Sequence, residues 1–252
     1  MTERATATFA DDPSGIVLLL GVLSFAAGSV DAIGFLMLGG LFTAHVTGNL
    51  VVLAAHVATG RVESLARILA VPMFVVAVAL TRLLTIGLDE TRQGSLRLLL
   101  VLHLVLIVGL LTICVAAGGG LDPRAPIAVV AGMVGVSAMA VQNALVRISL
   151  IGAPATTVMT TDIATFVLDI CALLFLRDSN EISRAGNRAR RTGSAIAGFI
   201  VGCSLGAGLE ALIGPWCLML PAILAALALV LGFSLKESDI MAISGPRSVG
   251  HS

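Results

Sequence analysis

The sequence predicts an all-α, polytopic transmembrane helix bundle with an internal two-fold repeat, and three observations lead to this prediction. Hydrophobic residues make up 58% of the 252 residues and charged residues only 12%, with a mean hydropathy of +1.05. Soluble domains contain about 25% charged residues, so a soluble fold is excluded. Six apolar stretches are long enough to cross the roughly 30 Å hydrocarbon layer of a bilayer. Two further stretches start with polar residues and resemble each other.

The six expected full spans are stretches of about 18 to 24 residues. They cover residues 15–38, 66–88, 97–117, 126–147, 193–213 and 216–235. No basic segment precedes the first stretch, which is also too long for the apolar core of a signal peptide, so we expect it to be retained. The expected division is a cytoplasmic tail (1–14), a first membrane repeat (15–120), a second membrane repeat (121–236) with a basic cytoplasmic loop (177–192), and a cytoplasmic tail (237–252).

Two segments, Leu41–Thr59 and Thr156–Leu176, are ambiguous. Each starts with helix-capping residues before it turns apolar, so each could be a short full span or a half-helix that enters from a loop. The total is therefore six to eight, and six full spans plus two short or broken helices is favoured. A constant shift of 113 residues pairs the polar starts of the segments, for example Thr43 with Thr156. If the broken helices turn back, the halves are inverted; if they cross, the halves are parallel.

Arginine is concentrated between two of the expected spans, and this sets the expected orientation. The cluster consists of Arg177, Arg184, Arg188, Arg190 and Arg191. The positive-inside rule places it in the cytoplasm, and with either six or eight spans both chain ends are then cytoplasmic. The net charge is +0 and no long basic run occurs, so we expect no nucleic-acid partner.

Three motifs resemble a known family. They are "DAIGFLMLGGLFTAHVTGN" from Asp31, "QNALVR" from Gln142 and "TTVMTTD" from Thr156. Together they resemble the YoaK-like family of bacterial membrane proteins, a domain of unknown function, and the similarity covers about residues 15–235. The resemblance implies a small protein of the bacterial inner membrane and supplies no substrate. The second half departs from the pattern "TTxxTG", because Asp162 places an acid near the usual glycine.

Asp31, about two-thirds along the first span, is a candidate proton or cation site, or an anchor for a cationic solute group. An ionised carboxylate in the hydrocarbon costs at least about 2.5 to 3.5 kcal/mol, so it needs a partner. The alternative is a hydrogen bond to the backbone of the second interruption. His45 is a candidate proton-coupling residue, because histidine titrates near physiological pH. Asp169, two helical turns from Asp162, is a candidate relay carboxylate.

Each interruption also opens a helix, and the unpaired N–H groups of a first helical turn form a natural anion site. Ordinary helix capping is the alternative. Two amide side chains of the fourth main span could bond across helices or line the same cavity. The binding candidates in these segments are Thr47, Gly48, Asn49, Gln142, Asn143, Thr160, Thr161 and Asp162. Among them, Asp162 would favour a cation or a proton over an anion.

A stripe of small residues predicts close helix packing. Gly198, Gly202 and Gly206 form a double GxxxG pattern, which also offers a possible homodimer interface. The four cysteines lie in apolar segments without CxxC spacing and are expected to be packing residues. We therefore expect neither a metal site nor a cofactor.

The favoured function is a secondary transporter or channel-like facilitator for a small polar solute, coupled to a proton or cation. Matching discontinuous helices in two halves are typical of such proteins, and the site is expected near the bilayer midplane between them. One alternative is a non-transporting membrane scaffold or accessory subunit. An intramembrane enzyme is less favoured, because the sequence contains neither an HExxH nor a GxSxG motif.

Overall fold

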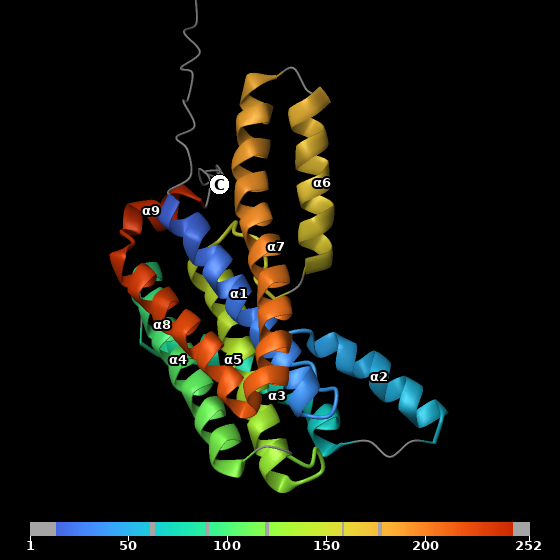
Figure 1. The fold of residues 1–252 in the computed structure, drawn as a ribbon. Coiled ribbons are helices and arrows are strands. Elements are labelled where there is room, and N and C mark those ends of the chain that lie inside the picture. Colours follow the sequence, from blue (N-terminus) through green and yellow to red (C-terminus); the bar gives the residue numbers. More distant parts are fainter. Residues whose placement is uncertain are drawn as a thin grey trace, which may run out of the picture.

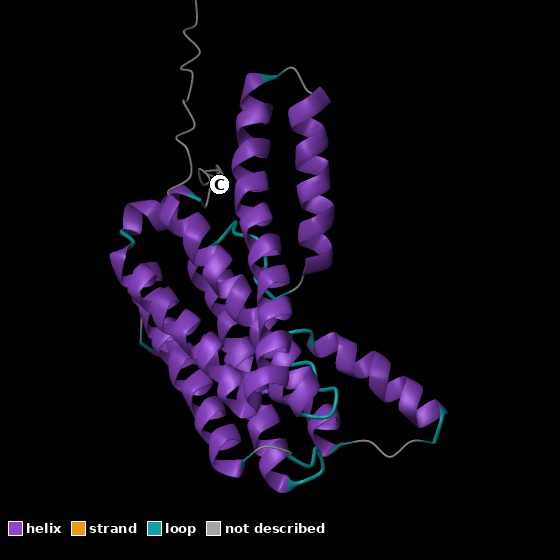
Figure 2. Cartoon of the chain, in the orientation of Figure 1, coloured by secondary structure: helices purple, strands orange, loops and turns teal. Residues whose placement is uncertain are grey.

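The computed structural model describes residues 14–60, 64–88, 91–118, 121–157, 159–175 and 178–243, and within these ranges the chain is helical without strands (Figure 1, Figure 2). The helices are α1 (Ser14–Met37), α2 (Val46–Ala58), α3 (Leu65–Gly87), α4 (Arg92–Ala117), α5 (Pro126–Ser149), α6 (Met159–Phe175), α7 (Ser179–Ile213), the short 3-10 helix η1 (Gly214–Leu218), α8 (Met219–Ser234) and α9 (Glu237–Ala242). Arg177 and most of the two expected tails lie outside the described residues.

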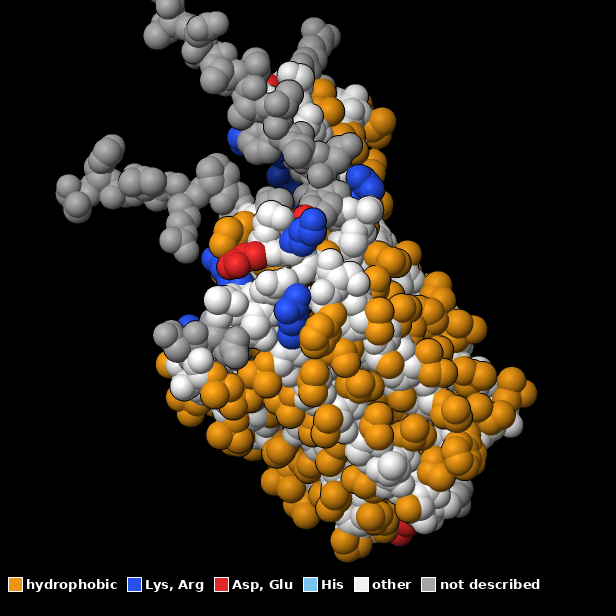
Figure 3. Space-filling view, turned by 90° about the vertical axis from the view of Figure 1, so that its left-hand side faces the viewer, with side chains coloured by type: hydrophobic (Ala, Val, Ile, Leu, Met, Phe, Trp, Pro, Cys, Tyr) orange, Lys and Arg blue, Asp and Glu red, His pale blue; other side chains and the backbone are white. Residues whose placement is uncertain are grey.

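The long helices fall where apolar stretches predict spans. Within the described residues, five helical runs are long and apolar enough to cross a membrane, and one of them is a run of 56 residues that contains both α7 and α8. Gly214, with a φ of 55°, and η1 divide this run, so that α8 turns back along the bundle (Figure 1). Hydrophobic side chains cover the body of the bundle, and Lys and Arg gather toward one end of it (Figure 3). The chain is a multi-pass helical membrane protein.

The predicted glycine stripe packs inside the chain, against α1. A Cβ atom at Gly198 would overlap with the carbonyl oxygen of Gly21, and one at Gly202 would overlap with that of Phe25. A Cβ at Gly206 would lie 2.9 Å from the backbone of α1. The contacts advance in the same order along both helices, so α1 and α7 are parallel (Figure 1). Because α1 covers this stripe, it is not available to a second copy of the chain.

The other long helices alternate in direction (Figure 1). Leu235, which follows α8, contacts the first turns of both α1 and α4, at Gly15 and Gln93. α8 is therefore antiparallel to both. α5 is antiparallel to α4 and packs on it, with Nδ1 of His103 3.1 Å from the Ala138 carbonyl oxygen. We call the end where α1 and α4 begin and α8 finishes the α9 end of the bundle.

The two short helices do not reverse the chain direction. α6 is antiparallel to α7, because Asp169 bonds to Arg188 and the ring of Phe166 lies beside Gly193. Since α7 is antiparallel to α5, α5 and α6 run in the same direction. α2 similarly leaves the bundle at the end where α1 finishes, and α3 leads back from there toward the α9 end (Figure 1). The helices before and after each interruption therefore run in the same overall direction.

The segment predicted as a basic loop, residues 177–192, is helical from Ser179 onward, because α7 continues through it. Residues 179–192 form the first turns of this 35-residue helix and project past the start of α1, with α6 alongside (Figure 1). The Asp178 side chain caps the helix by accepting a hydrogen bond from the Asn180 N–H at 2.9 Å. Charged composition indicated a loop, whereas this capping and the partner helix α6 stabilise a polar helix.

Candidate functional site

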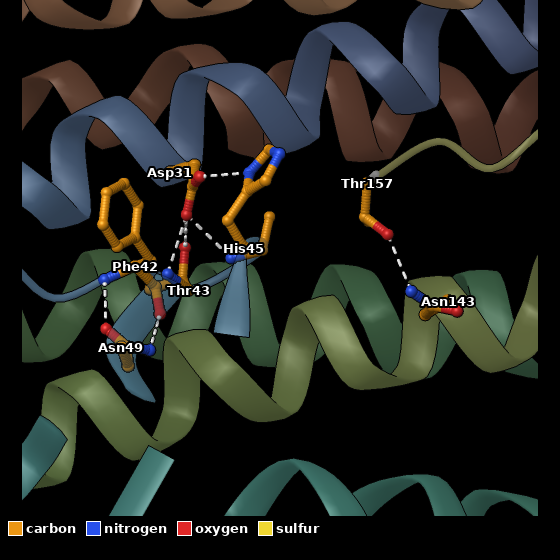
Figure 4. Close-up of polar contacts among 8 residues, drawn as sticks. Asp31, Phe42, Thr43, His45, Asn49, Asn143 and Thr157 are labelled. Atoms are coloured by element: carbon orange, nitrogen blue, oxygen red, sulfur yellow. Dashed lines mark hydrogen bonds and ion pairs between the residues drawn. The ribbon is translucent and has the colours of Figure 1, made fainter. Parts of the chain in front are cut away.

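The first interruption, residues 38–45, is held by Asp31 of α1. Its Oδ1 accepts hydrogen bonds from the backbone N–H groups of Thr43 and Ala44, both at 2.8 Å, and from the Thr43 hydroxyl at 3.3 Å (Figure 4). Gly39 and Gly40, with φ of 65° and 81°, turn the chain back so that these groups can reach α1. The buried carboxylate is therefore bonded to the interruption of its own half. The alternative prediction, a hydrogen bond from Asp31 to the backbone of the second interruption, is wrong.

His45 completes the environment of Asp31. Its Nδ1 lies 2.7 Å from Oδ2, so with Asp31 ionised this nitrogen carries the proton (Figure 4). The imidazole also packs edge-on against Phe199 of α7, with ring centroids 5.3 Å apart. The His45 side chain is 34% exposed and that of Asp31 7% exposed. The histidine therefore stands between the buried acid and the space outside.

A pocket of about 420 Å³ lies over this pair. Its walls are mainly apolar and contain three phenylalanine rings. It is lined by Asp31, Ala32, Phe35, Leu36, Phe42, His45, Phe199, Cys203 and Ala207. A space of this size can hold a small solute, with the acid and the imidazole as its polar groups.

The residues that open α2 support the interruption and do not line the pocket. Asn49 is fully buried, and its amide both accepts from the Phe42 N–H at 3.0 Å and donates to the Phe42 carbonyl at 2.8 Å (Figure 4). Gly48 leaves room for the Phe42 ring, which would lie 3.1 Å from a Cβ there. Thr47 is exposed. The N–H groups that bind a carboxylate are those of Thr43 and Ala44 in the preceding turn, and the carboxylate is that of Asp31.

The second interruption, between α5 and α6, is held by amide side chains. Gln142 donates to the Thr156 hydroxyl at 2.9 Å and to the Leu23 carbonyl of α1 at 3.0 Å. Asn143 donates to the Thr157 hydroxyl at 2.7 Å (Figure 4). Asn143 and Thr156 also line a pocket of about 250 Å³. Both amides therefore join the interruption to the bundle.

Asp162 lies in the first turn of α6 and is buried. The backbone of Ala155 hydrogen-bonds to its carboxyl group, whereas Oδ2 has no hydrogen-bond partner. A separate pocket of about 190 Å³ contains Asp162 together with Arg188 and Arg191. The neighbouring candidates Thr160 and Thr161 are exposed.

The candidate relay residue Asp169 is the ion-pair partner of Arg188, whose Nε lies 3.1 Å from Oδ1. Asp169 is 3% exposed and Arg188 comes from α7, so the pair joins α6 to α7. Helix packing therefore accounts for Asp169, and no hydrogen bond given for the described residues joins it to Asp162.

A family model described as "Protein of unknown function (DUF1275)" matches residues 19–231. The chain belongs to the DUF1275 family. The match includes both interruptions and every residue that contacts Asp31 or Asp162. No curated protein and no solved structure matches the chain.

Candidates from the two halves of this DUF1275 protein line separate pockets. Asn49 belongs to the interruption where α1 ends, whereas Asp162 belongs to the interruption at the α9 end (Figure 1). Asp31 and His45 share one pocket, Asn143 lines a second, and Asp162 lines a third. Among the described residues, the first interruption bonds to Asp31 of α1 and Arg67 of α3, and the second bonds to amides of α5 and to Arg191 of α7. None of these hydrogen bonds joins the two interruptions, and a shared site at the bilayer midplane stays a prediction.

Two buried arginines of the DUF1275 protein were not among the candidates. Arg67, at the start of α3, donates to the carbonyl of Gly39 at 2.8 Å, and Arg191 of α7 donates to that of Gly152 at 3.3 Å. Both glycines have positive φ angles, of 65° and 91°. The sequence does contain a signal for these contacts: each glycine follows an apolar span, and each arginine comes at or before the start of the next one. The sequence does not show which carbonyl an arginine reaches.

Proposed function

We propose that this DUF1275 protein is a secondary transporter or channel-like facilitator for a small polar solute in the bacterial cytoplasmic membrane. The observation that carries the proposal is the Asp31–His45 pair at the base of the 420 Å³ pocket, beside an interrupted helix. Intramembrane acids are rare and mark solute or proton pathways by default. Interrupted helices supply the polar backbone groups that such pathways use.

A correspondence between the two halves of the chain supports the proposal. Exchanging the two halves leaves the pattern of helix neighbours unchanged: α1 packs on α7 and α8 as α5 packs on α3 and α4, and α2 packs on α3 as α6 packs on α7. Three kinds of polar contact also recur. The recurring pairs are Gly39–Arg67 with Gly152–Arg191, Phe42–Asn49 with Ala155–Asp162, and Asp31–Thr43 with Gln142–Thr156.

The directions of the helices favour six full spans. Because α5 and α6 run in the same direction, a membrane-crossing α6 would begin on the side where α5 begins. The hydrogen bond between Asn143, near the end of α5, and Thr157 instead supports a start of α6 near the end of α5. Six spans place α2 and α6 at opposite faces of the membrane, and the two halves are then inverted. Inverted repeats give carriers two similar conformations that open to opposite sides.

Charge supports a cytoplasmic location for the α9 end. Arg67 and Arg124 lie toward the opposite end, and the other nine described Lys and Arg residues lie toward the α9 end. The positive-inside rule then places the start of α1 and the end of α9 in the cytoplasm. The Asp31 pocket lies nearer the opposite, periplasmic side.

The pocket indicates the chemistry of the solute. Phe35 and Phe42 pack at a tilt of 42° with ring centroids 4.9 Å apart, and Phe199 packs edge-on against His45. Aromatic faces next to a carboxylate suit a cationic or hydrogen-bond-donating group on a compact apolar body. We therefore propose small amines as the first solute class to test.

The test is uptake into vesicles that contain the purified full-length chain, with and without a pH gradient. A mixture of amines, amino acids, sugars and organic acids is supplied, and mass spectrometry identifies what enters. Asp31→Asn should reduce the flux roughly tenfold or more, which corresponds to about 1.4 kcal/mol. Glu237→Gln, which removes an exposed carboxylate of α9, is the control and should leave the flux unchanged. No uptake by the folded wild-type chain would count against transport.

A scaffold function is the second candidate, and the hydrogen bonding of Asp31 favours it. This carboxylate already accepts from Thr43, Ala44 and His45, which is a sufficient structural role. If Asp31→Asn prevents folding and the wild type moves no solute, the scaffold function is supported. If the variant folds and loses flux, transport is supported.

A further inference from the structure

In each interruption, one side chain holds the backbone at a matching position. The two side chains, Asn49 and Asp162, differ only in that an amide nitrogen stands where the acid has an oxygen. In the first, the Asn49 amide makes two hydrogen bonds to the backbone of Phe42, one as acceptor and one as donor. In the second, Asp162 and Ala155 stand at the matching positions, each 113 residues further along. The backbone of Ala155 hydrogen-bonds to the carboxyl group of Asp162. An ionised carboxylate cannot make the second, donating bond.

The atom that lacks this bond is visible in the structure. Oδ2 of Asp162 has no hydrogen-bond partner in the protein, and the residue is only 5% exposed, so this oxygen is also shielded from solvent. A buried polar atom without a partner destabilises the folded state. A proton on this oxygen would make the carboxyl group equivalent to the amide of Asn49, with one acceptor and one donor. It could then donate to the Ala155 carbonyl as Asn49 donates to that of Phe42.

The surroundings allow both protonation states. Arg188 and Arg191 of α7 line the same 190 Å³ pocket as Asp162, and residues 150–157 contain no titratable side chain. Arg188 bonds to Asp169 and Arg191 donates to the Gly152 carbonyl. Burial favours the neutral acid, whereas the hydrogen bond from the Ala155 backbone favours the ionised carboxylate. The pocket is large enough for several water molecules, through which a proton can arrive.

We propose that Asp162 is a proton-binding site that fastens the second interruption when protonated and loosens it when ionised. The first interruption, fastened by the amide of Asn49, does not respond to pH in this way. The site stands independently of solute transport, since it requires only the backbone contact and the titratable oxygen. If the protein is a carrier, Asp162 makes the proton its coupling ion.

Hydrogen–deuterium exchange of the full-length chain in lipid nanodiscs tests the site. Peptides covering residues 150–157 and 38–45 are compared in the same sample from about pH 5 to about pH 8, a range that buried carboxyl groups reach. Intrinsic exchange accelerates with pH in both segments, so the ratio of their rates removes this common effect. Because His45 in the reference segment is itself titratable, the response of Asp162 is the part of the change in this ratio that Asp162→Asn abolishes. We expect residues 150–157 to exchange roughly three- to tenfold faster relative to 38–45 at high pH, the effect of losing one buried hydrogen bond.

Two variants make the result decisive. Asp162→Asn should hold the rate ratio at its low-pH value throughout, because the amide imitates the protonated acid. Asn49→Asp should make residues 38–45 respond to pH as well. A pH response that persists in Asp162→Asn, or a wild-type ratio that is constant with pH, overturns the proposal. Uptake is measured separately, so a protein without transport activity can still confirm the proton site.

Discussion

At the scale of single residues, the polar groups of the interruptions divide into those that support the backbone and those that can meet a ligand. Among the described residues, the Asn49 side chain bonds to the backbone of Phe42, and the Gln142 amide nitrogen bonds to Thr156 and Leu23, while Gln142 Oε1 has no partner. His45 is partly exposed and lies beside a pocket, and Asp162 has an oxygen without a partner. Residue type alone does not separate these roles, because each depends on which atoms the neighbouring helix presents.

Asn49→Ala should destabilise the folded protein. The substitution leaves the N–H and carbonyl groups of Phe42 without their side-chain partner, and one such buried group costs about 1 to 3 kcal/mol. Thermal unfolding in detergent, followed by circular dichroism, should show a lower midpoint. Thr47→Ala, an exposed change two residues away, is the control and should leave the midpoint within the experimental scatter. Equal midpoints for both variants would show that the hydrogen bonds between Asn49 and Phe42 do not stabilise the folded protein.

At the scale of helices, small residues decide which surfaces meet. Gly28 of α1 lies on the backbone of Phe199 while Gly198 and Gly202 lie on the backbone of α1, so the glycines interlock along this parallel pair. The close approach brings Phe199 and Cys203 of α7 to the Asp31 pocket. The glycine stripe that the sequence predicts for packing thus also forms a wall of the candidate site.

Gly202→Ala should therefore disturb both stability and the pocket. The added methyl group overlaps with the carbonyl of Phe25, and overpacking of this kind costs about 1 to 3 kcal/mol. The matched control is Gly208→Ala on the same helix, where a Cβ meets no atom within 4 Å. We expect a lower unfolding midpoint for the first variant and an unchanged or slightly higher one for the second. A tolerated Gly202→Leu would contradict the interlocked packing.

At the scale of the whole molecule, the inverted arrangement predicts where each short helix finishes. With six spans, the end of α2 faces the periplasm and the start of α7 faces the cytoplasm. With eight spans, both would face the cytoplasm. Ala58 and Asn180 are exposed residues at these two places. Ala58 reports on the difference, and Asn180, which is cytoplasmic with either number of spans, is the control.

Cysteine labelling in intact cells measures this topology. In a Cys171→Ser, Cys203→Ser background, Ala58→Cys should react with a membrane-impermeant maleimide from outside, whereas Asn180→Cys should react only after permeabilisation. Cys114 and Cys217 can remain, because both are buried. Protection of Ala58→Cys in intact cells would indicate eight spans and parallel halves.

The sequence by itself determined the helical membrane class, the positions of the long helices and the two polar interruptions with their shared spacing. These features depend on hydrophobic length and local capping, which neighbouring residues determine. Only the tertiary structure decided that Asp31 bonds to its own interruption, that α1 covers the glycines of α7, and that Asp31 and Asp162 line separate pockets. The physical reason is that helical periodicity fixes the face on which a side chain lies, whereas the partner of that face depends on how distant helices pack.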